Sequence, residues 1–347
     1  MRIMLKDTVM TLCELKGVSG NEDEVRNYIV ERIMPHIDEL RTDAIGNVMA
    51  FKRGAARTNK RVMLCAHMDE VGLIVTSIGS DGYLKFDTVG GIDRRVLLGK
   101  RVLVGPGSVP GIIGLKAYHL VSKEEEKNVP KVDAMYIDIG AGSAEEAEGL
   151  VNLGDTVCFA TEPEEFGEGF LKARAIDDRV GCAVMIELIE RRLPCDVWFA
   201  FTTQEEVGTR GAHTAAFEIQ PDIALVLEGT TAADLAGVEG PKRICSPGNG
   251  PVVPFMDRGT VYDRGLFTEI KTLADSAGIQ WQTKQMVAGG TDAAAVQRSR
   301  SGVRTAAISA AIRNIHSPVC IAKLSDMDGM LSLAELFLKE TADKYGI

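Results

Sequence analysis

The feature that most limits the fold is a set of short, strongly apolar runs, each followed closely by a histidine or by glutamates. Residues 61–66 precede His67, residues 223–227 precede Glu228, and residues 197–203 precede a glutamate pair. Such runs are typical of strands that are buried on both faces of a parallel sheet. In α/β sheets, ligand-binding residues lie at the carboxyl ends of the strands. The sequence therefore predicts an α/β fold with a functional site at one edge of the sheet.

Segments with the apolar spacing of helices lie between these runs. Residues 5–34 carry two of them, separated by a break at Ser19-Gly20-Asn21-Glu22 that also supplies capping groups. A further helix is predicted from Asp178 to about Arg191, and a last one from about Met327 to Ala342. Alternating strands and helices predict a sheet that is covered by helices.

The residue pattern changes between Val71 and about Glu164, where short β-rich runs are separated by glycine, proline and aspartate. The strands expected in this stretch cover residues 72–76, 101–104, 111–113, 134–138 and 156–159. A chain of 347 residues also exceeds the size of most single hydrophobic cores. We therefore expect a catalytic α/β domain at residues 1–70 and 165–347, with an inserted all-β domain at residues 71–164.

Composition argues against several kinds of partner. The formal net charge is −10 and no Lys/Arg run reverses it locally, so we expect no nucleic-acid partner. No stretch reaches the ~18 apolar residues of a membrane span, and the opening residues lack the apolar core of a signal peptide. We expect a cytoplasmic protein with no membrane partner. The seven scattered cysteines never form Cys-x-x-Cys, which predicts free, buried thiols.

Two of the candidate metal-binding motifs contain aspartates. His67 and Asp69 alternate at the end of a strand and so point to one side of it. There the imidazole can bind a metal ion while the carboxylate fixes its tautomer. Asp177 and Asp178 are adjacent acids at a helix start, where capping is the structural alternative to ligation.

The other candidates follow later strands. Glu205 and Glu206 follow the apolar run 197–203, where an unpaired charge would be costly. Neighbouring side chains alternate in direction, so one glutamate can ligate metal while the other, desolvated, has its pKa raised into the range of a general base. Glu228 ends a further strand and His316 follows another, and each taken alone is equally compatible with a structural role.

These candidates share one position, at strand ends or strand-to-helix turns of a single domain. They supply two histidines together with several carboxylates, a donor set that suits a pair of Zn, Co or Mn ions better than Mg or Ca. Two such ions can share a water molecule, lower its pKa and polarise a carbonyl group. The sequence therefore predicts metal-assisted hydrolysis of an amide bond.

Six short motifs follow one another along nearly the whole chain: His67-Met-Asp69-Glu-Val-Gly, Gly90-Gly-Ile-Asp-Arg-Arg-Val-Leu-Leu-Gly99, Ile176-Asp-Asp-Arg-Val-Gly-Cys182, Gln204-Glu-Glu-Val-Gly208, Gly289-Gly-Thr-Asp-Ala293 and Ile315-His-Ser-Pro318. In this order they resemble the tetrahedral aminopeptidases, dinuclear metallopeptidases that include glutamyl and deblocking aminopeptidases and chains once labelled cellulase M. The resemblance implies a phosphorylase/hydrolase-like mixed β-sheet sandwiched by helices. It also implies that the inserted β domain, barrel-like or PDZ-like, drives dimers into a hollow twelve-subunit tetrahedron.

The resemblance assigns the metal ligands. It implies that Asp177 bridges two divalent ions, that His67 and Glu228 complete one site, and that Glu206 and His316 complete the other. The ions would be Zn or Co, with Mn as an alternative.

Further roles follow from the same resemblance. Glu205 would be the general base, Asp69 would orient His67, and the Asp177–Asp178 peptide bond would be cis. Many relatives carry aspartate where this chain has Glu228, and the longer side chain can alter the spacing or the preference of the ions.

Four other residues are expected to stay outside the ligand set. Asp292 fits a glycine-rich turn that caps the following helix, and we expect it to support the site without ligating metal. His119 and His213 lack carboxylate neighbours in any strand-end pattern, so packing or surface positions are expected. Cys65 shares a strand face with the first histidine but should behave as a small buried hydrophobe.

Together these features predict an aminopeptidase that releases N-terminal residues from short peptides with a free N-terminus. One alternative is a two-metal amidase acting on a small N-acyl substrate. A glycosidase using Glu205 and a second acid is disfavoured because it needs no two-histidine metal site. A catalytically silent scaffold is disfavoured because it would be expected to lose some of the ligands. The sequence does not fix which N-terminal residue is preferred.

Overall fold

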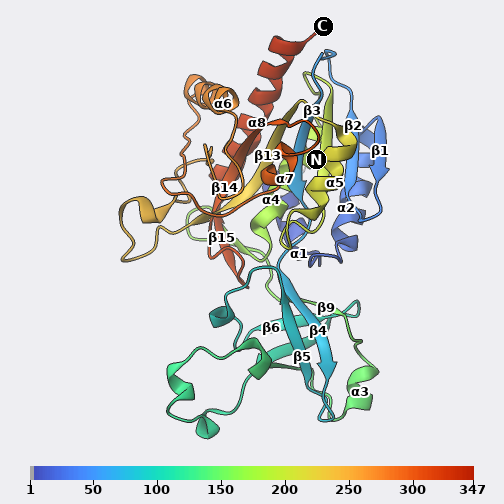
Figure 1. Cartoon of the computed structure of the whole chain (residues 1–347), viewed down its shortest axis with the longest axis vertical. Helices are drawn as coiled ribbons and strands as arrows, with labels where there is room; N and C mark the ends of the chain where they lie inside the picture. The colour runs from blue at the N-terminus through green and yellow to red at the C-terminus, as the bar shows by residue number, and fades with distance from the viewer. Residues whose placement is uncertain (1–3) are drawn as a thin grey trace.

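The structure, a computed structural model, describes residues 4–347 and consists of two regions joined by extended segments (Figure 1). The upper region in that view is a sheet covered by helices, and the lower region is a small β-barrel. This arrangement confirms the predicted fold class. The residue bounds of the two domains stay a prediction, and the first three residues of the catalytic domain lie outside the described residues.

The large sheet has nine strands in the order β1 (Glu39–Thr42), β2 (Val48–Lys52), β12 (Val197–Thr202), β3 (Val62–His67), β13 (Ile223–Ala232), β14 (Arg304–Arg313), β15 (Cys320–Lys323), β11 (Phe170–Ala173) and β10 (Glu164–Phe166). The four strands from β12 to β14 run parallel to one another. The pairs toward both edges are antiparallel. The sheet is therefore mixed, as predicted, and its parallel centre brings four carboxyl ends to one edge.

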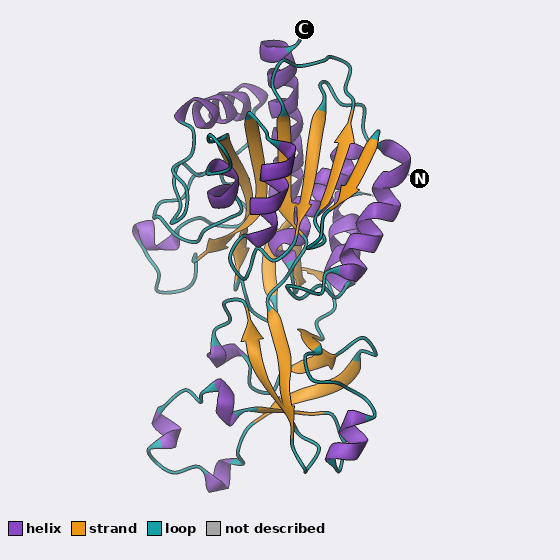
Figure 2. Cartoon of the chain, turned by 45° about the vertical axis from the view of Figure 1, so that its right-hand side comes forward, coloured by secondary structure: helices purple, strands orange, loops and turns teal. Residues whose placement is uncertain are grey.

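Helices cover both faces of this sheet (Figure 2). One face carries α1 (Leu5–Glu14), α2 (Asp23–Ile33), α4 (Ile176–Ile189), α6 (Arg264–Ala277) and α8 (Leu324–Tyr345). The other face carries α5 (Arg210–Ile219) and α7 (Ala293–Gln297). The predicted helices agree with α2, α4 and α8 to within three residues at each end.

Strand β3 shows why the predicted apolar runs fold in this way. All of its side chains are buried, and successive ones point to opposite faces of the sheet. Leu64 belongs to the core under α1, α4 and α8, whereas Met63 and Cys65 belong to the core under α5 and α7. Helix α4 is buried along its whole length, which explains why it is apolar all round.

The barrel closes through the strand order β4 (Gly72–Ile78), β5 (Leu84–Val89), β8 (Tyr136–Asp138), β7 (Val109–Gly114), β6 (Arg101–Val104) and β9 (Thr156–Phe159). Neighbouring strands are antiparallel and enclose a separate apolar core. A short helix, α3 (Ala144–Glu148), packs beside β4. The sequence analysis missed β5, in which Leu84 and Phe86 are buried between exposed polar residues.

Six short 3-10 helices complete the described elements: η1 (Met34–His36), η2 (Arg94–Val96), η3 (Tyr118–Leu120), η4 (Glu125–Lys127), η5 (Val132–Ala134) and η6 (Gly240–Arg243). All seven cysteines are buried and free, as predicted. Among residues 4–347, no helix combines the length and the apolar character needed to cross a membrane.

The core packing generates a stability prediction. Leu64 is fully buried in β3, so we expect Leu64→Ala to lower the free energy of unfolding by about 2–5 kcal/mol, because it leaves a cavity between the sheet and its helices. Denaturant unfolding followed by circular dichroism measures this loss. Leu153→Ala makes the same chemical change at a side chain that is 65% exposed, and it should cost far less. Equal losses in the two variants would contradict this account of the core.

Candidate metal centre

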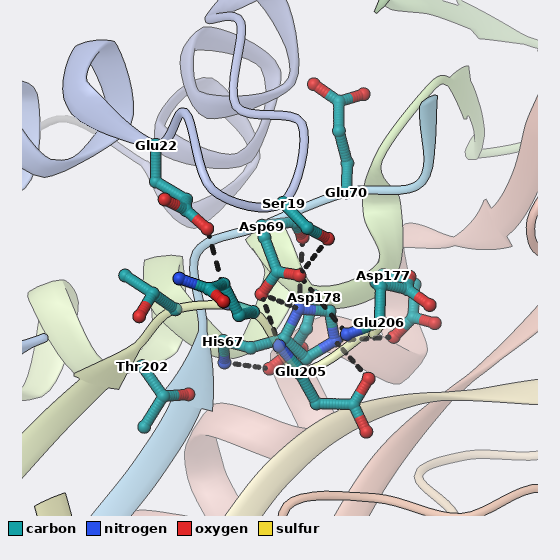
Figure 3. Close-up of polar contacts among 12 residues, drawn as sticks. Ser19, Glu22, His67, Asp69, Glu70, Asp177, Asp178, Thr202, Glu205 and Glu206 are labelled. Carbon is teal, nitrogen blue, oxygen red and sulfur yellow. Dashed lines mark hydrogen bonds and ion pairs between the residues drawn. The ribbon is translucent and has the colours of Figure 1, made fainter. Parts of the chain in front are cut away.

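The register of the parallel strands brings the predicted residues to one edge of the sheet. Thr202, at the end of β12, lies opposite His67, at the end of β3. In β13, Val226 lies opposite Cys65, so Glu228 comes level with His67 two residues further on. The glutamate pair follows β12 directly, and the second histidine follows β14. Figure 3 shows the resulting cluster, to which β3, the start of α4 and the turn after β12 contribute.

Asp177 occupies the centre of this cluster, between two imidazole rings. Its Oδ1 atom lies 3.7 Å from Nε2 of His67, and its Oδ2 atom lies 3.4 Å from Nε2 of His316. The backbone N–H of Gly229 also donates to Oδ1 at 3.1 Å. A carboxylate that directs one oxygen toward each of two histidines has the arrangement of a ligand shared by two metal ions.

Each histidine also has a glutamate beside it. Nε2 of His67 lies 3.5 Å from Oε2 of Glu228, and Nε2 of His316 lies 3.1 Å from Oε2 of Glu206. The cluster thus divides into two histidine–glutamate pairs on either side of Asp177. The sequence resemblance groups the same residues as metal ligands, and that role stays a prediction.

Asp178 offers a second way to group the ligands, because its carboxylate also lies near His67 and Glu228. Its oxygens already accept hydrogen bonds from the backbone N–H groups of His67 at 3.2 Å and Gly181 at 2.9 Å. Burial raises the pKa of Asp178 well above its usual value. Asp177 touches both histidines and Asp178 does not, so Asp177 is the better candidate for a bridging ligand.

The cluster confines more negative charge than its histidines balance, which is why a divalent metal fits it. Burial raises the pKa of Glu206 to about 8 and that of Glu228 to about 7, and it raises the pKa of Glu205 well above its usual value. Charges on neighbouring acids add to the effect in all three cases. Divalent cations would offset both the burial and the mutual repulsion. The combination of imidazole and carboxylate donors suits Zn, Co or Mn.

Asp69 lies beside His67 mainly through its backbone oxygen, whereas the sequence analysis assigned the orientation of His67 to its carboxylate. Its backbone oxygen lies 3.0 Å from Nδ1 of His67, closer than its carboxylate at 3.5 Å. The carboxylate accepts the backbone N–H groups of Glu205 at 2.9 Å and Glu206 at 3.1 Å, together with the hydroxyl of Ser19 at 2.6 Å (Figure 3). Asp69 therefore fixes the turn that carries both glutamates against the end of β3.

Both imidazoles have a backbone oxygen beside Nδ1. For His67 this oxygen belongs to Asp69, and for His316 it belongs to Gly91, at 3.1 Å. In a neutral imidazole, a hydrogen bond from Nδ1–H to a carbonyl leaves Nε2 as the nitrogen without a proton, and Nε2 can then bind metal. Gly91 lies between β5 and β6, so a segment next to the barrel takes part in orienting the second histidine.

The sequence analysis missed a buried cluster of charged residues between the end of β3, the start of α4 and the end of α1. Oε1 of Glu70 accepts hydrogen bonds from Arg174 and Arg179, and from the backbone N–H of Gly17 at 3.2 Å. The two guanidinium groups also donate to backbone oxygens of α1 and of Leu15, just after it. Glu70 stands next to Asp69 in the sequence, but nothing local indicates partners more than a hundred residues away.

Glu22 is a second supporting residue that the sequence analysis treated only as part of a helix break. It is 2% exposed, and its Oε1 atom accepts the backbone N–H groups of Gly20 at 2.6 Å and Gln204 at 3.2 Å. Burial raises the pKa of Glu22 to about 7. Together with Ser19, it connects the loop between α1 and α2 to the turn that carries the glutamate pair (Figure 3).

The backbone is unusual at several positions around the cluster. Ala175, Gln204 and His316 each adopt a φ of 55°, in the left-handed region that side chains normally avoid. Such conformations concentrate at functional sites, where surrounding contacts hold them in place. The predicted cis peptide bond between Asp177 and Asp178 is present.

Among the residues set aside by the sequence analysis, Asp292 precedes α7, but its side chain makes no capping hydrogen bond, so the predicted cap is wrong. Its Oδ2 atom instead accepts the hydroxyl of Thr202 at 2.5 Å. The backbone N–H of Asp292 donates to Oε1 of Glu228 at 3.3 Å, and Oδ2 of Asp292 lies 3.7 Å from Sγ of Cys65. Asp292 therefore sits behind Glu228. His119 and His213 are exposed, on η3 and α5 respectively, and neither contributes to a potential metal-binding group in the described part of the chain.

Comparison with known proteins identifies relatives over nearly the whole chain. The family model described as M42 glutamyl aminopeptidase matches residues 46–333. A putative aminopeptidase of Acetivibrio thermocellus is 37% identical over 329 residues, which cover 94% of this chain and 96% of that protein. The lysyl aminopeptidase of Pyrococcus furiosus is 31% identical, with 95% of each chain covered. The TET1 peptidase of Pyrococcus horikoshii has a similar structure, with a TM-score of 0.85 and 34% sequence identity. The match covers 97% of this chain and 100% of that chain. That peptidase can assemble into a tetrahedron or a large octahedral shell.

The protonation of the histidines predicts how metal affinity depends on pH. Burial lowers the pKa of His316, but Asp177 and Glu206 outweigh this effect and raise it to about 9 in the metal-free protein. A metal ion must displace that proton, so below about pH 9 we expect affinity to fall roughly tenfold per pH unit for each proton released. Competition with a chelating dye for Co²⁺ or Mn²⁺ between pH 6 and 8 measures this slope. His316→Gln should reduce the slope, and an affinity independent of pH would contradict the assignment.

Proposed function

The chain belongs to the M42 glutamyl aminopeptidase family, and from that premise we propose that it removes N-terminal residues from short peptides with two divalent metal ions and a glutamate base. The observation that carries the proposal is the position of Asp177, with one carboxylate oxygen directed toward each of two histidines. In this proposal His67 and Glu228 hold one ion, and Glu206 and His316 hold the other. The ions are Zn or Co, with Mn as an alternative.

Bound at these ligands, the two ions would lower the pKa of a water molecule and polarise the scissile carbonyl. Glu205 would transfer the protons. Oε2 of Glu205 lies 4.0 Å from Nε2 of His67, at the edge of the ligand cluster, and burial raises its pKa toward the range of a general base. Glu205 would take a proton from the attacking water and return it to the departing amide nitrogen as the C–N bond breaks.

The neighbouring glutamates would divide two roles because their side chains leave the same turn in different directions. Glu206 approaches His316, and Glu205 approaches His67. Asp69 accepts both of their backbone N–H groups and so holds the two carboxylates at fixed places relative to β3. A carboxylate beside the ions, such as that of Glu205, would also favour a substrate with a positive charge close to the scissile bond, as a free N-terminus has.

We also propose that the chain self-associates through its barrel, in dimers that build a twelve-subunit tetrahedron. The barrel region carries large apolar side chains that are exposed in the single chain, among them Tyr118 (79%), Leu120 (59%) and Ile112 (53%). Tyr118 and Leu120 lie on the same short helix, η3, and apolar side chains gathered on one exposed surface are typical of interfaces. The assembly of the Pyrococcus horikoshii peptidase supports the proposed geometry.

The oligomer prediction is tested by the mass in solution. Light scattering coupled to gel filtration should give about twelve times the chain mass of 37.4 kDa. Tyr118→Ser combined with Leu120→Ser should shift the protein to smaller species, because it removes apolar surface from the proposed contact. A wild-type protein that stays monomeric at every concentration tested would contradict the proposal.

The catalytic proposal is tested with a panel of free and N-acetylated short peptides, before and after chelation. We expect release of amino acids from the free peptides alone, loss of activity with chelator, and recovery with Zn²⁺, Co²⁺ or Mn²⁺. Equal cleavage of acetylated and free peptides would rule out an aminopeptidase. Cleavage of small N-acyl amino acids alone would indicate an amidase.

Glu205 and Glu206 provide a matched pair of variants for the same assay. Glu205→Gln should lower kcat about 10²- to 10⁴-fold while metal content, measured by mass spectrometry, stays at the wild-type level. Glu206→Gln should lower metal content as well as activity. A Glu205→Gln variant with wild-type kcat would show that another group is the base.

A further inference from the structure

Asn47 is a fully buried asparagine that contacts both ends of the segment carrying the glutamate pair. This segment, the glutamate turn (residues 203–211), runs from the end of β12 into the first residues of α5. Oδ1 of Asn47 accepts the backbone N–H of Thr203 at 2.9 Å, and Nδ2 donates to the backbone oxygen of Gly211 at 3.0 Å. One carboxamide therefore bridges the two ends of the turn, with its acceptor at one end and its donor at the other.

The glutamate turn also closes on itself through its backbone. The N–H of Gly211 donates to the backbone oxygen of Thr203 at 3.0 Å. A side chain at position 211 would prevent this approach, because a Cβ atom there would lie 2.3 Å from Oδ1 of Asn47 and 2.4 Å from the backbone oxygen of Thr203. The glutamate pair lies between the two ends, where Asp69 accepts its backbone N–H groups (Figure 3). Asn47 thus holds the turn at its ends, and Asp69 holds it at the glutamates.

Further contacts fix the orientation of the Asn47 side chain. Nδ2 lies 2.6 Å from Oδ2 of Asp43 and 2.7 Å from Oγ1 of Thr214 on α5. The backbone N–H of Asn47 also donates to Oδ1 of Asp43 at 3.0 Å. Thr203 presents a donor, whereas Gly211 and Asp43 present acceptors, so only an amide with its nitrogen toward the acceptors satisfies the set. A carboxylate of the same shape would face both acceptors without a hydrogen to donate.

The glutamate turn determines where the proposed general base lies. Glu205 is outside the proposed ligand set, and its Oε2 atom lies 4.0 Å from Nε2 of His67. Glu206 leaves the same turn, but a bound ion would hold it from the other side, together with His316. A general base has to lie within hydrogen-bond reach of the proton that it takes, and a displacement of about 1 Å can slow a reaction about 100-fold. Loosening the turn is therefore expected to affect the base before it affects the ligand.

We propose that Asn47 is a positioning residue for the reaction: by joining the two ends of the glutamate turn, it holds the carboxylate of Glu205 where it reaches the attacking water. The inference rests on the proposed aminopeptidase function. It requires that Asn47 influence the rate through Glu205, so that replacing the base makes the asparagine unimportant for the rate. An asparagine that only stabilises the fold would lower the rate by the same factor whichever residue stands at position 205.

The test is a double-mutant cycle of Asn47→Asp and Glu205→Gln, assayed on a fluorogenic amide of the N-terminal residue that the peptide panel ranks first. Rates are measured at saturating Co²⁺, so that a weakened ligand is still occupied. We expect Asn47→Asp to lower kcat about 10- to 100-fold, because it loses the donor to Gly211 and displaces the base. In the Glu205→Gln background the same substitution should change kcat less than about threefold.

A second readout separates the base from the metal ligand on the same turn. The visible absorption of bound Co²⁺ reports the geometry of its ligands. We expect the Co²⁺ spectrum of Asn47→Asp to match that of the wild type, because the ion keeps Glu206 in place. A changed spectrum would assign the effect of Asn47 to the ligand and would overturn the inference.

Control variants separate positioning from a loss of fold. Asn27→Asp makes the same change at an exposed asparagine of α2 and should keep the wild-type kcat. Thr214→Val removes one partner of Nδ2 and leaves both end contacts of Asn47 in place, so it is the milder change. It should lower kcat less than Asn47→Asp does, again without effect in the Glu205→Gln background. If Asn47→Asp does not fold, Thr214→Val takes its place in the cycle.

The remaining outcomes distinguish a failure of this inference from a failure of the proposed function. Equal fold losses in the two backgrounds, or an unchanged kcat in Asn47→Asp, would overturn the role of Asn47 and leave the proposed function standing. A Glu205→Gln variant with the wild-type kcat would contradict the proposed base and the role of Asn47 together. Absence of chelator-sensitive cleavage of any peptide would contradict the proposed function itself, and the role of Asn47 would fall with it.

Discussion

The burial of several carboxylates and two imidazoles at one edge of the sheet is the constraint on which the rest of this structure depends. Removing such charges from water is unfavourable unless hydrogen bonds, opposite charges or metal ions compensate. The parallel centre of the sheet gathers these groups because its strands end in register, with Thr202 opposite His67. The surrounding backbone then supplies N–H donors, as Gly229 does for Asp177.

The supporting residues extend this compensation outward to the N-terminal helices. Asp69 joins β3 to the turn after β12, and Glu22 joins the same turn to the loop before α2. Glu70 forms ion pairs with two buried arginines, which also donate to backbone oxygens near the end of α1. Helices α1 and α2 are therefore connected to the cluster through buried polar contacts. Leaving one partner of such a contact unpaired would cost free energy of folding.

The sequence predicts the candidate metal ligands better than it predicts the buried residues that hold them in place, and the reason is physical. Strand ends are local features, so His67, Glu228 and the glutamate pair could be assigned to one edge from apolar runs alone. The partnership of Glu70 with Arg174 and Arg179 joins residues more than a hundred positions apart and leaves no local pattern. Strand β5 was missed because its buried residues alternate with polar ones over a short stretch.

Adjacent acids in this chain show what only the fold can decide. Asp177 and Asp178 are chemically identical, yet Asp178 has both oxygens on backbone N–H groups while Asp177 directs its oxygens toward two histidines. The carboxylate of Asp69 likewise accepts hydrogen bonds from the backbone N–H groups of the two glutamates that face the cluster. An acid with both oxygens on backbone donors holds the site in place. An acid that keeps an oxygen beside an imidazole Nε2 can bind metal, as Asp177 and Glu228 could, although each also accepts one backbone N–H group. The position of each carboxylate relative to the backbone therefore separates structural acids from ligand candidates, which residue type and spacing leave undistinguished.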